Sequence, residues 1–122
     1  MTMTNENSFS HEDSIVDEFR FSRVGPKAEQ WQALRDYARE AMPRFLLFLE
    51  RREEHLRELE TDLCLLLRLG MSPKQIVILM GISYQHLNIL RKRLLKKVYG
   101  EEGPARLFDE KIRQESIKVH FV

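Results

Sequence analysis

The side chains best able to do chemistry lie between Ser83 and Val98, where polar and apolar residues follow a helical spacing. An α-helix turns by 100° per residue. This rotation brings four apolar residues, spaced by three or four, onto one side of the helix: Leu87, Leu90, Leu94 and Val98. The other side collects two amides, three cations, a phenol and a β-branched residue: Tyr84, Gln85, Asn88, Ile89, Lys92, Arg93 and Lys96. Amides can pair with adenine edges, cations can reach guanine or phosphate, and a β-branched side chain can touch a thymine methyl.

Two helices joined by a tight turn would position these side chains. Ser72 can cap a first short helix with Pro73 in its first helical position, and Gly81 permits the stop at its end. Ser83 can then cap the second helix, whose free N–H groups could bind phosphate. A short helix, a glycine turn and a longer capped helix are typical of a helix-turn-helix. The sequence therefore predicts that the second helix, at residues 84–98, enters a DNA major groove.

The expected DNA contacts divide into two sets. The residues expected to face bases are Tyr84, Gln85, Asn88, Ile89 and Lys92. The residues expected to hold phosphates are Ser72, Lys74, Ser83, Arg91, Arg93, Lys96 and Lys97. Burial in protein would also explain an apolar residue at position 89.

Local charge favours this interpretation although the formal net charge of the whole chain is only +1. Residues 91–97 include five cations and no acid, whereas acids concentrate elsewhere in the chain. A phosphate meets the local field and not the total charge. A basic helix face is usually only solvated, so the charge favours DNA binding only together with the two caps and the glycine turn.

The remaining sequence predicts an all-α fold, a helical bundle with one modest core. The expected divisions are a disordered segment at 1–12, a helical scaffold with a potential dimerisation surface at 13–55, the helix-turn-helix domain at 56–100, and a C-terminal helix and tail at 101–122. Within the scaffold, Trp31, Phe45 and Phe48 are expected to form a core cluster.

Two segments leave alternatives open. Residues 44–69 contain no glycine or proline and could form one helix of about 25 residues, spanning about 40 Å. That length is unusual for a small domain, so two helices with a bend near residues 54–57 are favoured. After a final helix at 105–116, the last six residues alternate apolar and polar side chains. This alternation is strand-like, but a lone strand has no partner in a helical chain, so the segment could pair with a second copy of the chain or be loose.

Other kinds of chemistry find little support in the sequence. Cys64 is the only cysteine and lies among leucines, so we expect it in the core. The histidines are scattered with no pair at metal-ligand spacing: His11, His55, His86 and His120. There is no glycine-rich phosphate loop and no nucleophile elbow. We therefore predict no enzyme activity and no cofactor, metal or small-molecule ligand.

The expected location follows from the same absences. No apolar run approaches the roughly 20 residues that a membrane helix requires. The polar N-terminus lacks the basic and apolar regions of a signal peptide. These features predict a cytoplasmic protein. The helix-turn-helix predicts that its partner is double-stranded DNA. A homodimer is also expected, because one small monomer rarely supplies enough contacts for specific binding.

Residues 56–97 resemble the LuxR/GerE-type DNA-binding domain, which carries a G-x-S-x-K-x-I-A step and a G-I-S turn. The matching residues are Gly70, Ser72, Lys74, Ile76, Gly81, Ile82 and Ser83, with Lys74 one place from the usual lysine. Arg57 stands where the family usually has a capping Ser or Thr, three residues before Glu60. Ile89 replaces what is commonly a polar contact position.

The whole chain is similar to the cytoplasmic C-terminal regions of Bacteroidetes transcriptional regulators. The landmarks include Ile15-Val16, Trp31, Pro43, Cys64, Leu67-Arg68-Leu69 and Gly100-Glu101-Glu102-Gly103. This resemblance implies a helical DNA-binding module that often acts as a dimer.

A protein–protein interaction module is the alternative function. Residues 44–69 carry an apolar stripe of Phe45, Leu49, Leu56, Leu59, Leu63 and Leu66. This stripe could pair with a partner helix. The basic face of the second helix would then be incidental or would contact an acidic protein.

Overall fold

The computed structural model describes residues 14–52 and 54–120, with side chains up to residue 115. These residues form helices and no strand, which confirms the all-α prediction. Residues 14–21 are helical, and the other helices are α2 (Ala28–Ala41), α3 (Pro43–Glu50), α4 (Glu58–Arg68), α5 (Pro73–Met80), α6 (Tyr84–Tyr99) and α7 (Ala105–His120). The disorder expected at residues 1–12 lies outside the described residues.

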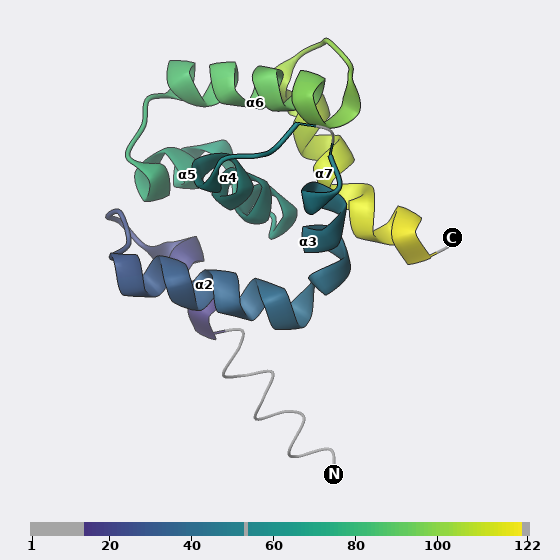
Figure 1. Cartoon of the computed structure of the whole chain (residues 1–122). Helices are drawn as coiled ribbons and strands as arrows, with labels where there is room; N and C mark the ends of the chain where they lie inside the picture. Colours follow the sequence, from purple (N-terminus) through teal and green to yellow (C-terminus); the bar gives the residue numbers. More distant parts are fainter. Residues whose placement is uncertain (1–13, 53, 121–122) are drawn as a thin grey trace.

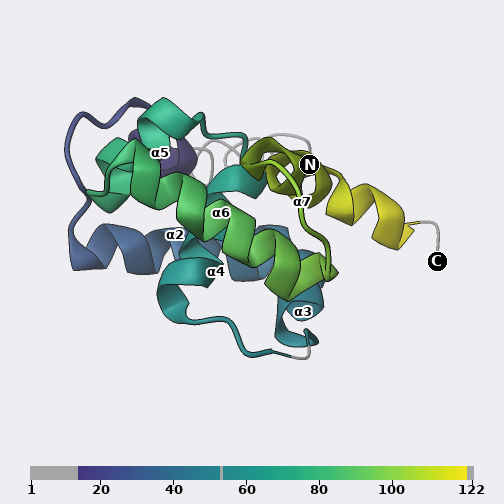
Figure 2. The same cartoon turned by 90° about the horizontal axis from the view of Figure 1, so that it is seen from above.

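The helices are arranged around α4 (Figure 1). In that view α6 crosses the top of the molecule, α2 runs along the opposite side, and α3 and α7 lie together at one end. Seen from above, α6 passes over α2 and α4 (Figure 2). One long side of α6 is therefore not covered by any other described helix.

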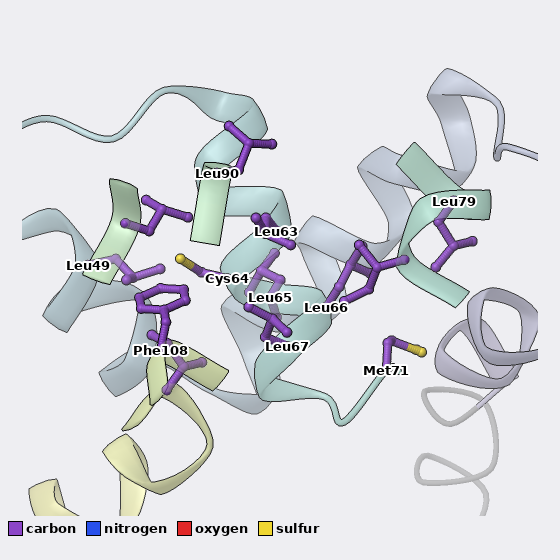
Figure 3. Packing of buried hydrophobic residues seen from close by; sticks show 14 of the residues in the cluster. Leu49, Leu63, Cys64, Leu65, Leu66, Leu67, Met71, Leu79, Leu90 and Phe108 are labelled. Carbon is purple, nitrogen blue, oxygen red and sulfur yellow. The ribbon is translucent and has the colours of Figure 1, made fainter. Parts of the chain in front are cut away.

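The core is centred on α4 because this helix is enclosed on nearly every side. The five residues from Leu63 to Leu67 are each no more than 1 % exposed. Figure 3 shows Cys64 pointing toward Leu49 of α3 and Phe108 of α7. A stretch of helix that is apolar all round must be buried, and full burial of one leucine side chain is worth about 1.5–3 kcal/mol.

Residues 44–69 form two helices, as the sequence favoured, but the break is longer than the expected bend at 54–57. The connection between α3 and α4 covers residues 51–57. Arg52 contributes to ending α3, because its Nε donates a hydrogen bond to the carbonyl oxygen of Phe48 at 2.9 Å. This bond satisfies a carbonyl group in the last turn of α3, where helix carbonyls lack partners.

The start of α4 is fixed by Glu60 instead of by a side-chain cap at position 57. Glu60 Oε1 accepts a hydrogen bond from the backbone N–H of Arg57 at 2.8 Å. Arg57 itself offers no acceptor and makes no side-chain cap. Half of a capping box is therefore enough to begin this helix, because the packing of α4 supplies the remaining stability.

The strand-like interpretation of the last six residues is wrong for residues 117–120, which continue α7 as far as His120. Residues 121–122 lie outside the described part of the chain. The first turns of α7 are anchored by Phe108 and Ile112, both 0 % exposed. Once a helix is nucleated in this way, each further residue adds a hydrogen bond at little cost, so a short alternating pattern does not stop it.

Candidate nucleic-acid interface

The caps of α5 and α6 lie at the predicted residues. Ser72 Oγ accepts a hydrogen bond from the backbone N–H of Gln75 at 3.2 Å, and Ser83 Oγ accepts one from that of His86 at 3.0 Å. Gly81, which ends α5, has a φ of +65°. Glycine is favoured there because it adopts this left-handed conformation without steric penalty. The predicted short helix, glycine turn and longer capped helix are all present.

α6 separates its side chains onto the two predicted faces. The inner face is in the core, with Leu87, Leu90, Leu94 and Val98 each no more than 5 % exposed. The residues predicted to face bases are all exposed: Tyr84, Gln85, Asn88, Ile89 and Lys92. Ile89 in particular is 48 % exposed, so burial within the described chain does not explain this apolar residue.

Arg91 was expected to hold phosphate, but its side chain is directed into the protein. Arg91 is 8 % exposed and pairs with Asp109 of α7 at 2.7 Å. It also donates a hydrogen bond to Asn88 Oδ1 at 2.8 Å. Burial raises the pKa of Asp109, although the attraction of Arg91 opposes that shift. Arg91 therefore joins α6 to α7 and is not available on the surface.

Lys97 is likewise engaged inside the protein. Its Nζ lies 2.9 Å from Glu60 Oε1, and its side chain is only 16 % exposed. Burial alone would raise the pKa of Glu60, but the hydrogen bonds from the Arg57 backbone N–H and from Lys97 hold that pKa below its ordinary value. Lys97 therefore joins α6 to α4, and a phosphate contact would require breaking this pair.

Three of the predicted phosphate-binding cations are exposed: Lys74, Arg93 and Lys96. Lys92, which was predicted to face bases and can also reach phosphate, is exposed as well and brings the exposed cations to four. Lys96 lies 3.7 Å from Glu102, but both side chains are more than half exposed, so this ion pair is weak. Ser72 and Ser83 use their oxygens as cap acceptors and keep their hydroxyl hydrogens as donors. Ten of the twelve residues predicted to contact DNA are therefore exposed, on the surface of α6 and at the starts of α5 and α6.

Gln75 is a positioning residue that the sequence did not reveal. Its Nε2 donates hydrogen bonds to the carbonyl oxygens of Phe19 and Ser22, both at 2.7 Å. These carbonyls lie at the end of the first helix, more than fifty positions away in the chain. The orientation of α5 therefore depends on the first helix of the scaffold and the residue just after it.

Phe45 belongs to the hydrophobic core, and Trp31 and Phe48 pack against it, as predicted. Within this core the aromatic rings make two separate sets of contacts. Trp31 packs edge-on against Phe19, with ring centroids 5.0 Å apart. Phe45 and Phe48 stack at 6.4 Å, and Phe48 contacts Tyr99 of α6 at 6.0 Å. These rings support the fold and the end of α6 from within the chain.

Most side chains of the apolar stripe at 44–69 are buried in the core of the same chain. Phe45, Leu49, Leu63 and Leu66 are each no more than 4 % exposed. Leu59 is the large hydrophobic residue of the stripe that remains exposed, at 41 %. The stripe therefore does not offer a continuous surface to a partner helix.

Cys64 is fully buried, and that burial raises its thiol pKa. Among the side chains that the structure describes, at residues 14–52 and 54–115, no group of three or more His, Cys, Asp and Glu could hold a metal ion. No helix in this part of the chain is both long and apolar enough to cross a bilayer.

No protein-family model, curated protein or solved structure matches this chain.

Proposed function

We propose that the chain is a DNA-binding transcriptional regulator, or the DNA-binding module of one, in which α5 and α6 act as a helix-turn-helix. The observation that carries this proposal is the division of α6. One face is buried against the core, and the opposite face exposes amides and lysines along a surface helix (Figure 1). A helix of this width fits the major groove of B-DNA, which is about 12 Å wide.

The contacts of Asn88 refine its expected role. Because Asn88 Oδ1 accepts a hydrogen bond from Arg91, its amide nitrogen is the group left to donate. A donor of this kind suits the acceptor atoms of purines in the major groove. Gln85 has no such internal bond among the described residues, so it keeps both groups for paired bonds to adenine.

The proposed regulator acts as a homodimer in the cytoplasm. One copy exposes a single α6 surface, and specific binding usually needs a larger interface than one small module provides. Two copies related by a two-fold axis would read two half-sites about one helical turn apart.

Salt dependence tests the proposal directly. If the four exposed cations each neutralise one phosphate, log affinity should fall with log salt at a slope of about −3.6 per copy, doubled in a dimer. Fluorescence anisotropy with a labelled duplex at several salt concentrations measures this slope. Affinity that does not depend on salt would refute the proposal.

A further inference from the structure

A basic cleft lies where the connection between α3 and α4 meets the C-terminal end of α6. Its volume is about 480 Å³. Its charged lining consists of Arg51, Arg52, Glu54, Lys96 and Lys97. Four of these five side chains are cations, so the cleft attracts anions.

Arg52 is held in a fixed position on one wall of the cleft. Its Nε donates to the carbonyl oxygen of Phe48 at 2.9 Å, and its guanidinium carbon lies 4.1 Å from the centroid of the Phe48 ring. Neither contact uses the two terminal nitrogens of the guanidinium. A guanidinium fixed in this way loses little conformational freedom when its terminal nitrogens bind a phosphate.

Two further cations of the cleft are available at its surface. Arg51 is exposed just after the end of α3. Lys96 is 62 % exposed on the α6 wall, and its Nζ lies 3.7 Å from the exposed Glu102. Lys97 is excluded because it pairs with the buried Glu60. Among the described residues, the cleft thus offers three available cations and one carboxylate, that of Glu54.

The cleft lies on the side of α6 opposite to α5. Figure 2 shows α5 on one side of α6 and the connection at residues 51–57 on the other. In Figure 1 the same connection rises from α3 toward the level of α6. A helix lying in the major groove has one phosphate backbone on each side of it. The start of α5 could contact the phosphate backbone on one side of α6, and the cleft could contact the backbone on the other side.

We propose that Arg51 and Arg52 of the α3–α4 connection bind the second DNA backbone, so that the DNA interface includes the scaffold as well as α5 and α6. This inference rests on the proposed function. It adds two phosphate contacts to the four of α5 and α6, which steepens the salt slope to about −5.4 per copy. Phosphate contacts carry no sequence information, so the preferred DNA sequence stays the same without them.

The size of the effect follows from the slope. One phosphate contact contributes 0.9 to the slope, which corresponds to about an eightfold change in affinity at about 0.1 M salt. Arg51→Gln should therefore weaken duplex binding about eightfold and reduce the slope by about 0.9 per copy. Glu54→Gln should strengthen binding, because it removes a carboxylate of the cleft that repels phosphate.

The experiment compares the wild-type chain with Arg51→Gln, Arg51→Gln/Arg52→Gln and Arg39→Gln in anisotropy titrations at several salt concentrations. Arg39 is the matched control, because it is an exposed arginine that belongs to α2 and does not line the cleft. Thermal melting of each variant checks the fold, since Arg52 also packs on Phe48. The single variant at the exposed Arg51 decides the outcome if the double variant is unstable.

The outcomes separate this inference from the proposed function. A reduced slope for Arg51→Gln with an unchanged slope for Arg39→Gln supports the second backbone contact. Salt-dependent binding that is identical in the wild type and Arg51→Gln overturns the role of the cleft and leaves α6 as the DNA-binding element. Failure of the wild type to bind duplex DNA overturns both.

Discussion

Replacing Glu60 with glutamine removes a buried charge and keeps the shape of the side chain. In the native chain Glu60 Oε1 accepts hydrogen bonds from the backbone N–H of Arg57 and from Lys97 Nζ. Glutamine can keep the first bond, but Lys97 then faces a neutral acceptor. Removing one charge of a fully buried pair costs about 3–5 kcal/mol. Because Lys97 is still 16 % exposed, we expect Glu60→Gln to lower the free energy of unfolding by about 2–3 kcal/mol.

The stability lost in Glu60→Gln should be smaller at acid pH than at neutral pH. The pKa of Glu60 is lower in the folded chain than its ordinary value. The ionised side chain therefore stabilises the fold above the unfolded pKa of about 4.3, and this contribution is lost as the pH falls through the folded pKa. A protonated Glu60 is close in shape and charge to glutamine. The stabilities of the wild type and Glu60→Gln should consequently converge in acid.

Urea unfolding followed by circular dichroism over a pH series measures both effects. Glu58→Gln is the matched control, because Glu58 lies on the same helix but is 76 % exposed, 3.6 Å from Arg35. This variant should lose less than about 1 kcal/mol at neutral pH. The reasoning is refuted if the two variants lose the same stability at neutral pH, or if the deficit of Glu60→Gln persists unchanged in acid.

Three further predictions test the interface and the core. Lys92→Glu/Lys96→Glu should abolish duplex binding in a gel-shift assay with an unchanged melting temperature, since both side chains are exposed; a large drop in that temperature would contradict it. Ser83→Ala should cost about 1 kcal/mol in urea unfolding, because it removes the cap of α6, and a neutral result would count against that cap. Leu65→Ala should cost about 2–5 kcal/mol, because Leu65 is 1 % exposed. Leu59→Ala, at a site 41 % exposed, is the control and should cost clearly less; equal losses would argue against a core centred on α4.

The parts of the interface that the sequence predicted are those set by local chemistry. Ser72 and Ser83 each cap an N–H only three residues ahead, and the φ of Gly81 is a property of one residue. The alternation of faces on α6 also depends only on helical periodicity. Such features need no knowledge of how distant segments meet.

The internal pairs of Arg91 and Lys97 could not be predicted in the same way. Their carboxylate partners lie 18 and 37 residues away, on helices whose packing the sequence does not specify. For Arg91 the sequence did contain an indication of burial. At 100° per residue it falls about 40° from Leu87, inside the leucine face. A cation in that position requires a buried acid. Lys97 carried a weaker signal, since it lies at the margin of the same face.

The two hydrogen bonds donated by Gln75 bear on how this protein could be recombined. A gene fusion that transferred only residues 56–100 would carry Gln75 without the carbonyl groups of Phe19 and Ser22 that it binds. It would also leave behind Val16 and Phe19, which belong to the same core as the leucines of α4. The smallest part that can be grafted onto another protein as a working unit must therefore include the helix at 14–21. A shorter piece would leave the core that Val16 and Phe19 cover exposed to solvent.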